Sequence, residues 1–393
     1  MQRPFFSLVR SGLWGTAADT SLFQSLTPGD WQELYRMAQS QALLALTFDG
    51  ISTLPAELRP PRTLYLQWAA NTARIEQANE RLNRMVTELQ SLYTGADLHP
   101  VLLKGQGIAT NYRNPLHRQC GDIDIYLGKK GQPVANRLLL QQGARVEGEA
   151  SDKHASYDLR GVHIENHRII LRLNNPLANR RFRKLVEEWY PQGAEIITQG
   201  DEIIPTEAGD KQPPHSLPMP VPPPTFNALY IFLHAFVHFL NSGIGLRQLC
   251  DWTCLLARRH RDIDGQALLN QLQDLGLLRA AQAFGYIAVT RLGLPANYLP
   301  IPLEDAKERG EKLLEDIFAT GNFGQHDVRI KPRPKGYWAG KWYTFCRAMR
   351  RCNELRQFAP GEALWYPVTL IKGTVVIQIN RIKDRQHLCK PRN

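Results

Sequence analysis

The stretch that decides the fold is Gly121-Asp122-Ile123-Asp124-Ile125-Tyr126-Leu127, in which two aspartates alternate with apolar residues. Alternation with a period of two predicts a half-buried β-strand. Side chains two positions apart on a strand point to the same face, so we expect Asp122 and Asp124 side by side. Two adjacent carboxylates repel each other unless a cation lies between them. A divalent cation that takes oxygen ligands, such as Mg²⁺, would relieve this repulsion.

A short strand, a glycine turn and a helix start are predicted just before the aspartates. His99–Leu103 is typical of a buried strand, and Lys104-Gly105-Gln106-Gly107 follows it directly. A strand, a turn and a helix N-terminus expose backbone N–H groups to an anion, and Lys104 adds positive charge. We expect Lys104, Gly105, Gln106, Gly107, Arg118 and Gly121 to hold a nucleotide. Two alternatives stay open: Lys104 as a surface lysine, and Arg118 in a salt bridge with a carboxylate.

Two further strands are predicted downstream, joined near Gly161. In the second, Val162–His167, the side chains of His163, Glu165 and His167 share one face. Glu165 is therefore a candidate third carboxylate from a neighbouring strand. His163 and His167 are candidates to orient a ligand or act as a general base, although a structural, hydrogen-bonded role is favoured for His163. A phosphate cradle and three carboxylates are the parts that two-metal nucleotidyl transfer needs.

These motifs resemble a known family. The matching segments are Leu103-Lys104-Gly105, Arg118-x-x-Gly121-Asp122-Ile123-Asp124 and Ile164-Glu165-x-His167. They are similar to the uncharacterised nucleotidyltransferase family of bacteria, which belongs to the polymerase-beta-like nucleotidyltransferase superfamily. His234-x-x-x-His238 and Gly245–Trp252 resemble the helical part of that family, and the resemblance runs from about Thr63 to Ile382. The superfamily usually has Gly-Gly or Gly-Ser where this chain has Gly105-Gln106.

The resemblance implies an enzyme that transfers a nucleoside monophosphate from a nucleoside triphosphate to a hydroxyl or phosphate acceptor. Asp122, Asp124 and Glu165 would be the catalytic, metal-ligating residues. Mg²⁺ or Mn²⁺ would be the cofactor, and ATP the expected co-substrate. The acceptor could be a small molecule, a peptide, a sugar or tRNA. A catalytically inactive protein of the same fold, acting as a nucleic-acid-binding or adaptor module, is the alternative.

Composition sets the class of protein. The chain has 393 residues, 43% of them hydrophobic and 22% charged, as in a soluble globular protein. The most apolar stretch, Ala228–Leu240, is too short to span a bilayer, and no signal peptide is evident at the N-terminus. Six scattered cysteines favour buried free thiols in a reducing compartment, so a cytoplasmic protein is expected.

The pattern of helices and strands predicts an α+β fold, with a small mixed sheet embedded in helices. We expect an N-terminal helical region at 1–95 packing on the core, a nucleotidyltransferase-like core at 96–212, and a C-terminal helical domain at 213–393. Gln192–Pro224 is rich in Pro and Gly and predicts a connecting loop, with a possible hairpin between 195–197 and 202–204. A helix is predicted over 132–142.

Positive charge is concentrated at the C-terminal end. The net charge is +11, and Lys and Arg greatly outnumber Asp and Glu after Arg329. Such a region indicates an anionic partner, with nucleic acid as one possibility, although a solvated basic surface explains the charge alone equally simply. In the helical part, Arg247 and Asp251 lie four residues apart and so share a helix face. They are candidates to line the active cleft or to form an ordinary helix salt bridge.

Overall fold

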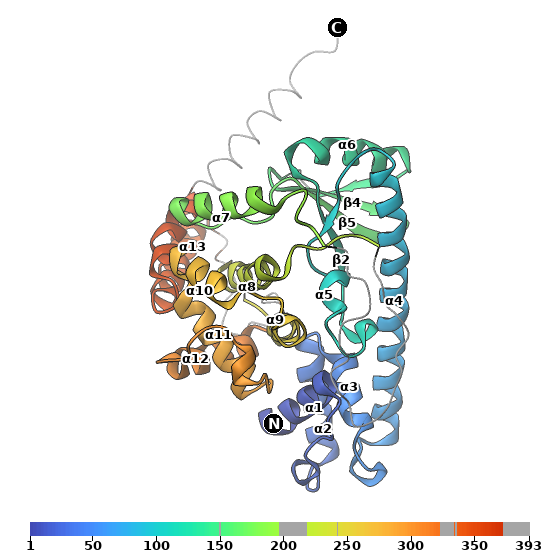
Figure 1. The fold of residues 1–393 in the computed structure, drawn as a ribbon. Helices are drawn as coiled ribbons and strands as arrows, with labels where there is room; N and C mark the ends of the chain where they lie inside the picture. The colour runs from blue at the N-terminus through green and yellow to red at the C-terminus, as the bar shows by residue number, and fades with distance from the viewer. Residues whose placement is uncertain (149–150, 196–217, 242, 323–333, 335, 372–393) are drawn as a thin grey trace.

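The structure is a computed structural model that describes residues 1–148, 151–195, 218–241, 243–322, 334 and 336–371. Most of these residues are helical, and the strands gather in one small sheet beside the long helix α4 (Figure 1). The α-helices before the sheet are α1 (Gln2–Trp14), α2 (Pro28–Ser40), α3 (Leu44–Ser52) and α4 (Arg62–Thr94). Those within and directly after it are α5 (Gln106–Ala109), α6 (Gly128–Gln141) and α7 (Pro176–Trp189). The remainder are α8 (Pro224–Asn241), α9 (Leu246–Arg259), α10 (Gly265–Asp274), α11 (Leu278–Thr290), α12 (Ala306–Thr320) and α13 (Tyr337–Leu355).

Five strands form one mixed sheet in the order β1-β2-β5-β4-β3. They are β1 (Val101–Leu102), β2 (Asp122–Tyr126), β3 (Arg145–Glu147), β4 (His154–Leu159) and β5 (Val162–His167). β2 and β5 are parallel neighbours, and the other adjacent pairs are antiparallel. This arrangement confirms the α+β class and the small mixed sheet that the sequence predicts.

One face of the sheet packs against α4 and α6. Ile123, Ile125 and Ile164 are fully buried on this face. Their partners in the same core are Met85, Val86 and Leu89 of α4 and Ala135 and Leu139 of α6. Burial of one isoleucine side chain contributes about 1.5–3 kcal/mol, so this core fixes which face of β2 is apolar. The alternation of the sequence then places the aspartates on the opposite face.

The N-terminal helices pack on the C-terminal helices as well as along α4. The rings of Phe5 and Phe6 lie 6.0 and 5.9 Å from that of Phe318 in α12. Gln41 donates from Nε2 to the carbonyl of Ile317 over 3.2 Å and accepts from the N–H of Leu246 over 2.7 Å. Helices from both ends of the chain therefore share one core, and the domain boundaries at 95 and 212 stay predictions.

Several elements differ from the sequence-based expectation. The helix predicted over 132–142 begins at Gly128, so Pro133 lies inside α6 and not in its first turn. Glu195 pairs in an isolated bridge with Val221, and residues 196–204 of the expected hairpin lie outside the described residues. The end of the basic C-terminal region, 372–393, also lies outside them. None of the helices in the part of the chain that the structure describes carries an apolar stretch sufficient to cross a bilayer.

A buried histidine joins α3, α4 and the turn Pro115–His117, and its titration should be visible in the stability of the fold. His117 Nδ1 lies 2.7 Å from an oxygen of Asp49, and Nε2 lies 2.8 Å from one of Glu76. Burial alone would lower the pKa of His117, but the hydrogen bonds and charges of these carboxylates raise it above its ordinary value. A histidine whose pKa is raised on folding stabilises the fold below the unfolded pKa, about 6.5, and this contribution is lost as pH rises through the folded pKa.

We therefore expect the stability difference between wild type and His117→Gln to be largest near pH 6 and to shrink toward pH 8. Urea unfolding at both pH values measures this difference. A difference that stays constant between the two would contradict a charged His117 in the fold.

Candidate active site

Three carboxylates converge on the face of the sheet opposite α4 and α6. The parallel register of β2 and β5 pairs Asp122 with His163 and Asp124 with Glu165. Asp122, Asp124 and Glu165 each offer a carboxylate oxygen, and these oxygens lie within 4.8 Å of one another. Asp124 is buried, whereas Asp122 and Glu165 are half-buried. The sequence prediction that Glu165 joins the aspartate pair from a neighbouring strand therefore matches the geometry.

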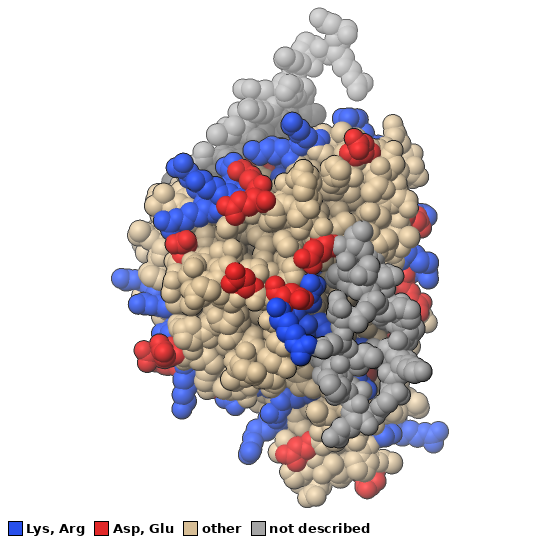
Figure 2. Space-filling model, viewed as in Figure 1, with Lys and Arg blue, Asp and Glu red and all other residues tan. Residues whose placement is uncertain are grey.

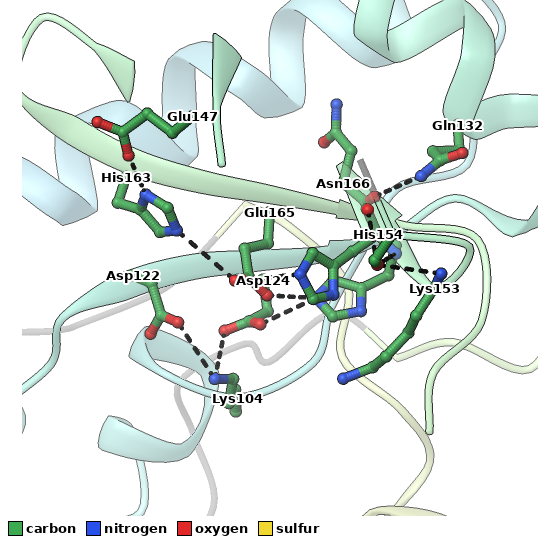
Figure 3. Close-up of polar contacts among 12 residues, drawn as sticks. Lys104, Asp122, Asp124, Gln132, Glu147, Lys153, His154, His163, Glu165 and Asn166 are labelled. Carbon is green, nitrogen blue, oxygen red and sulfur yellow. Dashed lines mark hydrogen bonds and ion pairs between the residues drawn. The ribbon is translucent and has the colours of Figure 1, made fainter. Parts of the chain in front are cut away.

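The cation between the two aspartates is Lys104. Its Nζ lies 2.9 Å from Asp124 Oδ2 and 3.3 Å from Asp122 Oδ2 (Figure 3). Burial disfavours its ammonium, but the charges of Asp124 and Asp122 raise the pKa of Lys104 above its ordinary value. Burial likewise opposes the charged form of Asp124, and Lys104 and His167 still lower its pKa. Lys104 thus partly neutralises the site, and it lies beside carboxylates and not on the open surface.

Gly105 forms the turn that carries Lys104 to the aspartates. Its φ of +59° and ψ of −120° belong to a region that other residues rarely adopt, and an added Cβ would lie 3.2 Å from the carbonyl of Asp122. The helix that follows, α5, has only four residues, and the N–H of Gly107 is already bonded to the carbonyl of Lys104. So short a helix has little dipole, so the positive charge of this turn comes mainly from Lys104.

Glu165 is surrounded by histidines from two strands. His167 Nε2 lies 3.0 Å from Asp124 Oδ1 and 3.1 Å from Glu165 Oε2. His154 and His163 each place Nε2 3.6 Å from Glu165 Oε1. His163 also contacts Glu147, over 2.6 Å from Nδ1, which supports the structural role favoured for it.

The protonation of this cluster follows from its charges. Burial would raise the pKa of Glu165, but the hydrogen bond and charge of His167 lower it to about 2. At His167 burial would lower the pKa, but the hydrogen bonds to Asp124 and Glu165 raise it above its ordinary value. At His154 the effect of burial is larger than that of the Glu165 charge, so the pKa is lowered. Glu165 is therefore ionised at neutral pH, and the imidazole proton of His167 lies between two carboxylates.

Two further residues, His154 and Lys153, contribute to the site although the sequence analysis did not select them. His154 pairs with His167 across β4 and β5, and the two ring centroids are 5.0 Å apart. The pKa of Lys153 is lowered by burial, against the opposing charges of Asp124 and Glu165. Figure 3 shows the Lys153 side chain extending beside the carboxylates. The period-two pattern of residues 154–159 places His154 on a definite face, but only the strand order brings that face beside Glu165.

Helix α8 faces the carboxylates from the other side of the site. Tyr230, His234 and His238 are spaced by four residues and so follow one face of the helix. Burial raises the pKa of Tyr230, and the charges of Asp124, Asp122 and Glu165 raise it further. The two histidines lie with their Nε2 atoms 3.3 Å apart. Burial and the charge of Lys104 lower the pKa of both, to about 4 for His238. His234 lines a cavity together with Lys104 and Asp122.

Arg118 and Asp251 form a buried bidentate salt bridge. Arg118 Nε donates to Asp251 Oδ1 and its terminal nitrogen to Oδ2, both over 2.7 Å. Tyr112 donates its hydroxyl to Asp251 Oδ1 over 2.6 Å. Of the two roles left open for Arg118, the structure shows the salt bridge, made with α9. The expected helix partner of Asp251, Arg247, donates to the carbonyl of Gln119.

A cavity of about 270 Å³ lies between the strand end at Asp122 and helices α8 and α9. Its lining includes Lys104, Gly105, Gly121 and Asp122 from the sheet side and His234 and Arg247 from the helices. Ligand pockets for drug-sized molecules are roughly 300–1,000 Å³, so this cavity suits phosphate groups better than a complete nucleotide. Asp122 therefore borders this cavity, whereas Asp124 is buried and neither Asp124 nor Glu165 is among the lining residues.

The donor set fits a hard divalent cation. Oxygen ligands from carboxylates are those that Mg²⁺ and Mn²⁺ prefer. Two of them, from Asp122 and Asp124, already hold a cation, the ammonium of Lys104, and Glu165 offers an oxygen within 4.8 Å of theirs. Asp122, Asp124 and Glu165 are the residues that would hold such an ion.

Comparison with known proteins agrees with this geometry. A family model described as uncharacterised nucleotidyltransferase matches residues 27–293, more than half of the chain. The chain belongs to this family. Comparison with curated proteins gave no match, and comparison with solved structures gave none either. The family description supports nucleotidyl transfer as the general activity, and it leaves the nucleotide, the acceptor and the metal to be argued from the site.

Proposed function

We propose that this nucleotidyltransferase binds a nucleoside triphosphate together with Mg²⁺ or Mn²⁺ and transfers its nucleoside monophosphate to a hydroxyl or phosphate acceptor. The observation that carries the proposal is the convergence of Asp122, Asp124 and Glu165 from two parallel strands, with Asp122 lining the adjoining cavity. When bound, the divalent ion would stabilise the charge that develops on the transferred phosphoryl group.

The positive residues of the site suit the triphosphate. Lys104 lies at the border of the cleft between the two aspartates, and Lys153 lies beside the same carboxylates. Divalent ions bound by the aspartates would take over the charge balance that Lys104 now provides. Its ammonium would then be available to a phosphate oxygen in the adjoining cavity, as a compact point charge. We assign the same task to Lys153.

Glu165 suits ion binding and orientation better than proton abstraction. A general base works best when its pKa lies near the operating pH, and the pKa of Glu165 is about 2. Its carboxylate, held by His167, can accept a hydrogen bond from the attacking hydroxyl and so orient it. Alignment of the attacking group with the phosphorus is a large part of catalysis in this class of reaction.

A second cavity offers space for the acceptor. It has a volume of about 930 Å³ and begins where β2 and β5 end, at Tyr126, Leu127 and Arg168. Tyr190 of the segment after α7 also lines it, as do the basic residues Lys129, Lys130, Arg172 and Arg183. A cavity with aromatic walls and a basic rim suits an acceptor that carries negative charge.

Nucleotide binding tests the proposal whichever acceptor the enzyme uses. Thermal unfolding of the full chain is followed with each of the four nucleoside triphosphates, with Mg²⁺, with Mn²⁺ and without a divalent ion. At a ligand concentration about 100 times Kd, binding stabilises the folded state by roughly 2.7 kcal/mol. We expect such a rise in Tm for at least one triphosphate, and only with the divalent ion. If no triphosphate raises Tm or releases heat on titration, the proposal fails.

The alternative, an inactive module that binds nucleic acid, depends on the basic charge after Arg329. Much of that region lies outside the described residues. On the face shown in Figure 2, Lys and Arg side chains are spread over the surface, with several near α7, and Asp and Glu lie among them. Steeply salt-dependent binding of DNA or RNA, without heat from Mg-ATP, would favour the alternative over the enzyme.

A further inference from the structure

A second group of possible metal ligands lies beside the three carboxylates. It consists of His154 on β4 with Glu165 and His167 on β5, whose ligand atoms lie within 4.8 Å of one another. His167 Nε2 is 3.1 Å from Glu165 Oε2, and His154 Nε2 is 3.6 Å from Glu165 Oε1. Antiparallel pairing of β4 and β5 places His154 directly opposite His167, and the two ring centroids are 5.0 Å apart.

These separations suit a single ion held by nitrogen and oxygen. Metal–ligand bonds of about 2.1 Å in a tetrahedral site put neighbouring ligand atoms about 3.4 Å apart. The distances of 3.1 and 3.6 Å to Glu165 lie on either side of this value. Asp124 Oδ1, 3.0 Å from His167 Nε2, is near enough to add a fourth ligand.

Both histidines present Nε2 to Glu165. The Nδ1 atoms of His154 and His167 are buried and have no hydrogen-bond partner among the described residues. The side chain of His167 is 3% exposed. Nε2 of His167 already lies between Asp124 Oδ1 and Glu165 Oε2, so a metal ion bound there would take the place of its proton.

We propose that His154, His167 and Glu165 bind a transition-metal ion, Mn²⁺ or Zn²⁺, next to the position formed by Asp122, Asp124 and Glu165. Carboxylate oxygens suit Mg²⁺, whereas imidazole nitrogen favours transition metals. The two positions share Glu165 but differ in their ligand chemistry. The centre is thereby asymmetric, with one all-oxygen position and one mixed nitrogen–oxygen position. Metal binding at the histidines needs no nucleotide and does not rest on the proposed function.

Direct detection of nitrogen coordination tests the proposal. The full chain, freed of metal with a chelator, is titrated with Mn²⁺ in the absence of nucleotide, and pulsed electron paramagnetic resonance is used to measure coupling between Mn²⁺ and imidazole nitrogen. We expect this coupling in the wild type and its loss in His154→Ala, with affinity for the ion reduced by about tenfold or more. His260, stacked on Tyr298 away from the site, supplies the matched control His260→Ala, which should behave as wild type.

Two more variants separate this proposal from the proposed function. Asp122→Asn removes a ligand from the all-oxygen position alone, so it should keep the nitrogen coupling even where Mg²⁺-dependent nucleotide binding is lost. The positive charge of Lys153 disfavours a second positive charge at His154 or His167. Lys153→Met removes this charge and should therefore tighten Mn²⁺ binding. Wild-type protein that binds Mn²⁺ without nitrogen coupling, or a His154→Ala variant that retains both coupling and affinity, would overturn the assignment.

Discussion

Replacement of Asp122 and Asp124 together by asparagine should reduce Mg²⁺-dependent nucleotide turnover at least about a thousandfold. Loss of a single electrostatic stabiliser of a transition state commonly costs about 10²–10³ in rate, and this change removes two of three carboxylate ligands. Asparagine retains the shape of the side chain and removes the charge, so β2 and its isoleucine face stay as they are. Transfer of label from an α-phosphate-labelled triphosphate to the components of a cell extract measures turnover, because the extract supplies the acceptor.

A matched control distinguishes the loss of ligands from the loss of any carboxylate. Asp158 on the neighbouring strand β4 forms a salt bridge with Arg145 over 3.0 Å and takes no part in the site. Asp158→Asn should leave turnover within a factor of about two. Unchanged turnover in the Asp122→Asn, Asp124→Asn variant, with a folded chain shown by urea unfolding, would remove the basis for the enzymatic assignment.

The sequence predicts the sheet and its acidic face because those depend on local periodicity. Alternating isoleucines and aspartates in β2 define two faces, and the pattern of β5 does the same for Glu165. The strands predicted at 99–103, within 121–127 and at 162–167 correspond to β1, β2 and β5 of the structure. Helix boundaries such as Leu246–Arg259 also follow from apolar spacing and flanking glycine.

Local sequence patterns do not predict contacts between distant segments of the chain. The pairing of Arg118 with Asp251 joins residues more than a hundred positions apart, so no local spacing in the sequence specifies it. His154 enters the site because β4 lies next to β5, an order that one strand's alternation does not specify. Helix α6 begins before the predicted start, and its contacts with the sheet outweigh the cost of Pro133 inside the helix.

Lys104 supplies, through a tertiary contact, the positive charge that the pair of aspartates requires. The two aspartates require a cation, and the sequence indicates Mg²⁺ for that task. The structure shows that the chain supplies one of its own, at 2.9 and 3.3 Å from the two carboxylates. A site built in this way can hold its carboxylates in place before the ion arrives, since their repulsion is already reduced.

The salt bridge between Arg118 and Asp251 should have the largest effect on stability. Both side chains are at most 8% exposed, and the pair connects the loop before β2 with α9. Burial raises the pKa of Asp251, but the charge of Arg118 lowers it overall, so the carboxylate is ionised. Arg118→Ala leaves this charge buried without its partner, which typically costs about 3–5 kcal/mol. Urea unfolding measures the cost, and Asp251→Ala should give a loss of similar size.

The double variant Arg118→Ala, Asp251→Ala separates the two roles considered for Arg118. Because neither charge then remains unpaired, its stability loss should be well below the sum of the single losses, with a coupling energy of about 0.5–3 kcal/mol. If Arg118 only positions the loop that leads to Asp122, nucleotide affinity should recover together with stability. If Arg118 also holds phosphate, the double variant should recover stability and still bind the triphosphate weakly. The comparison of unfolding with nucleotide titration on the same four proteins therefore shows whether the bridge supports the site or belongs to it.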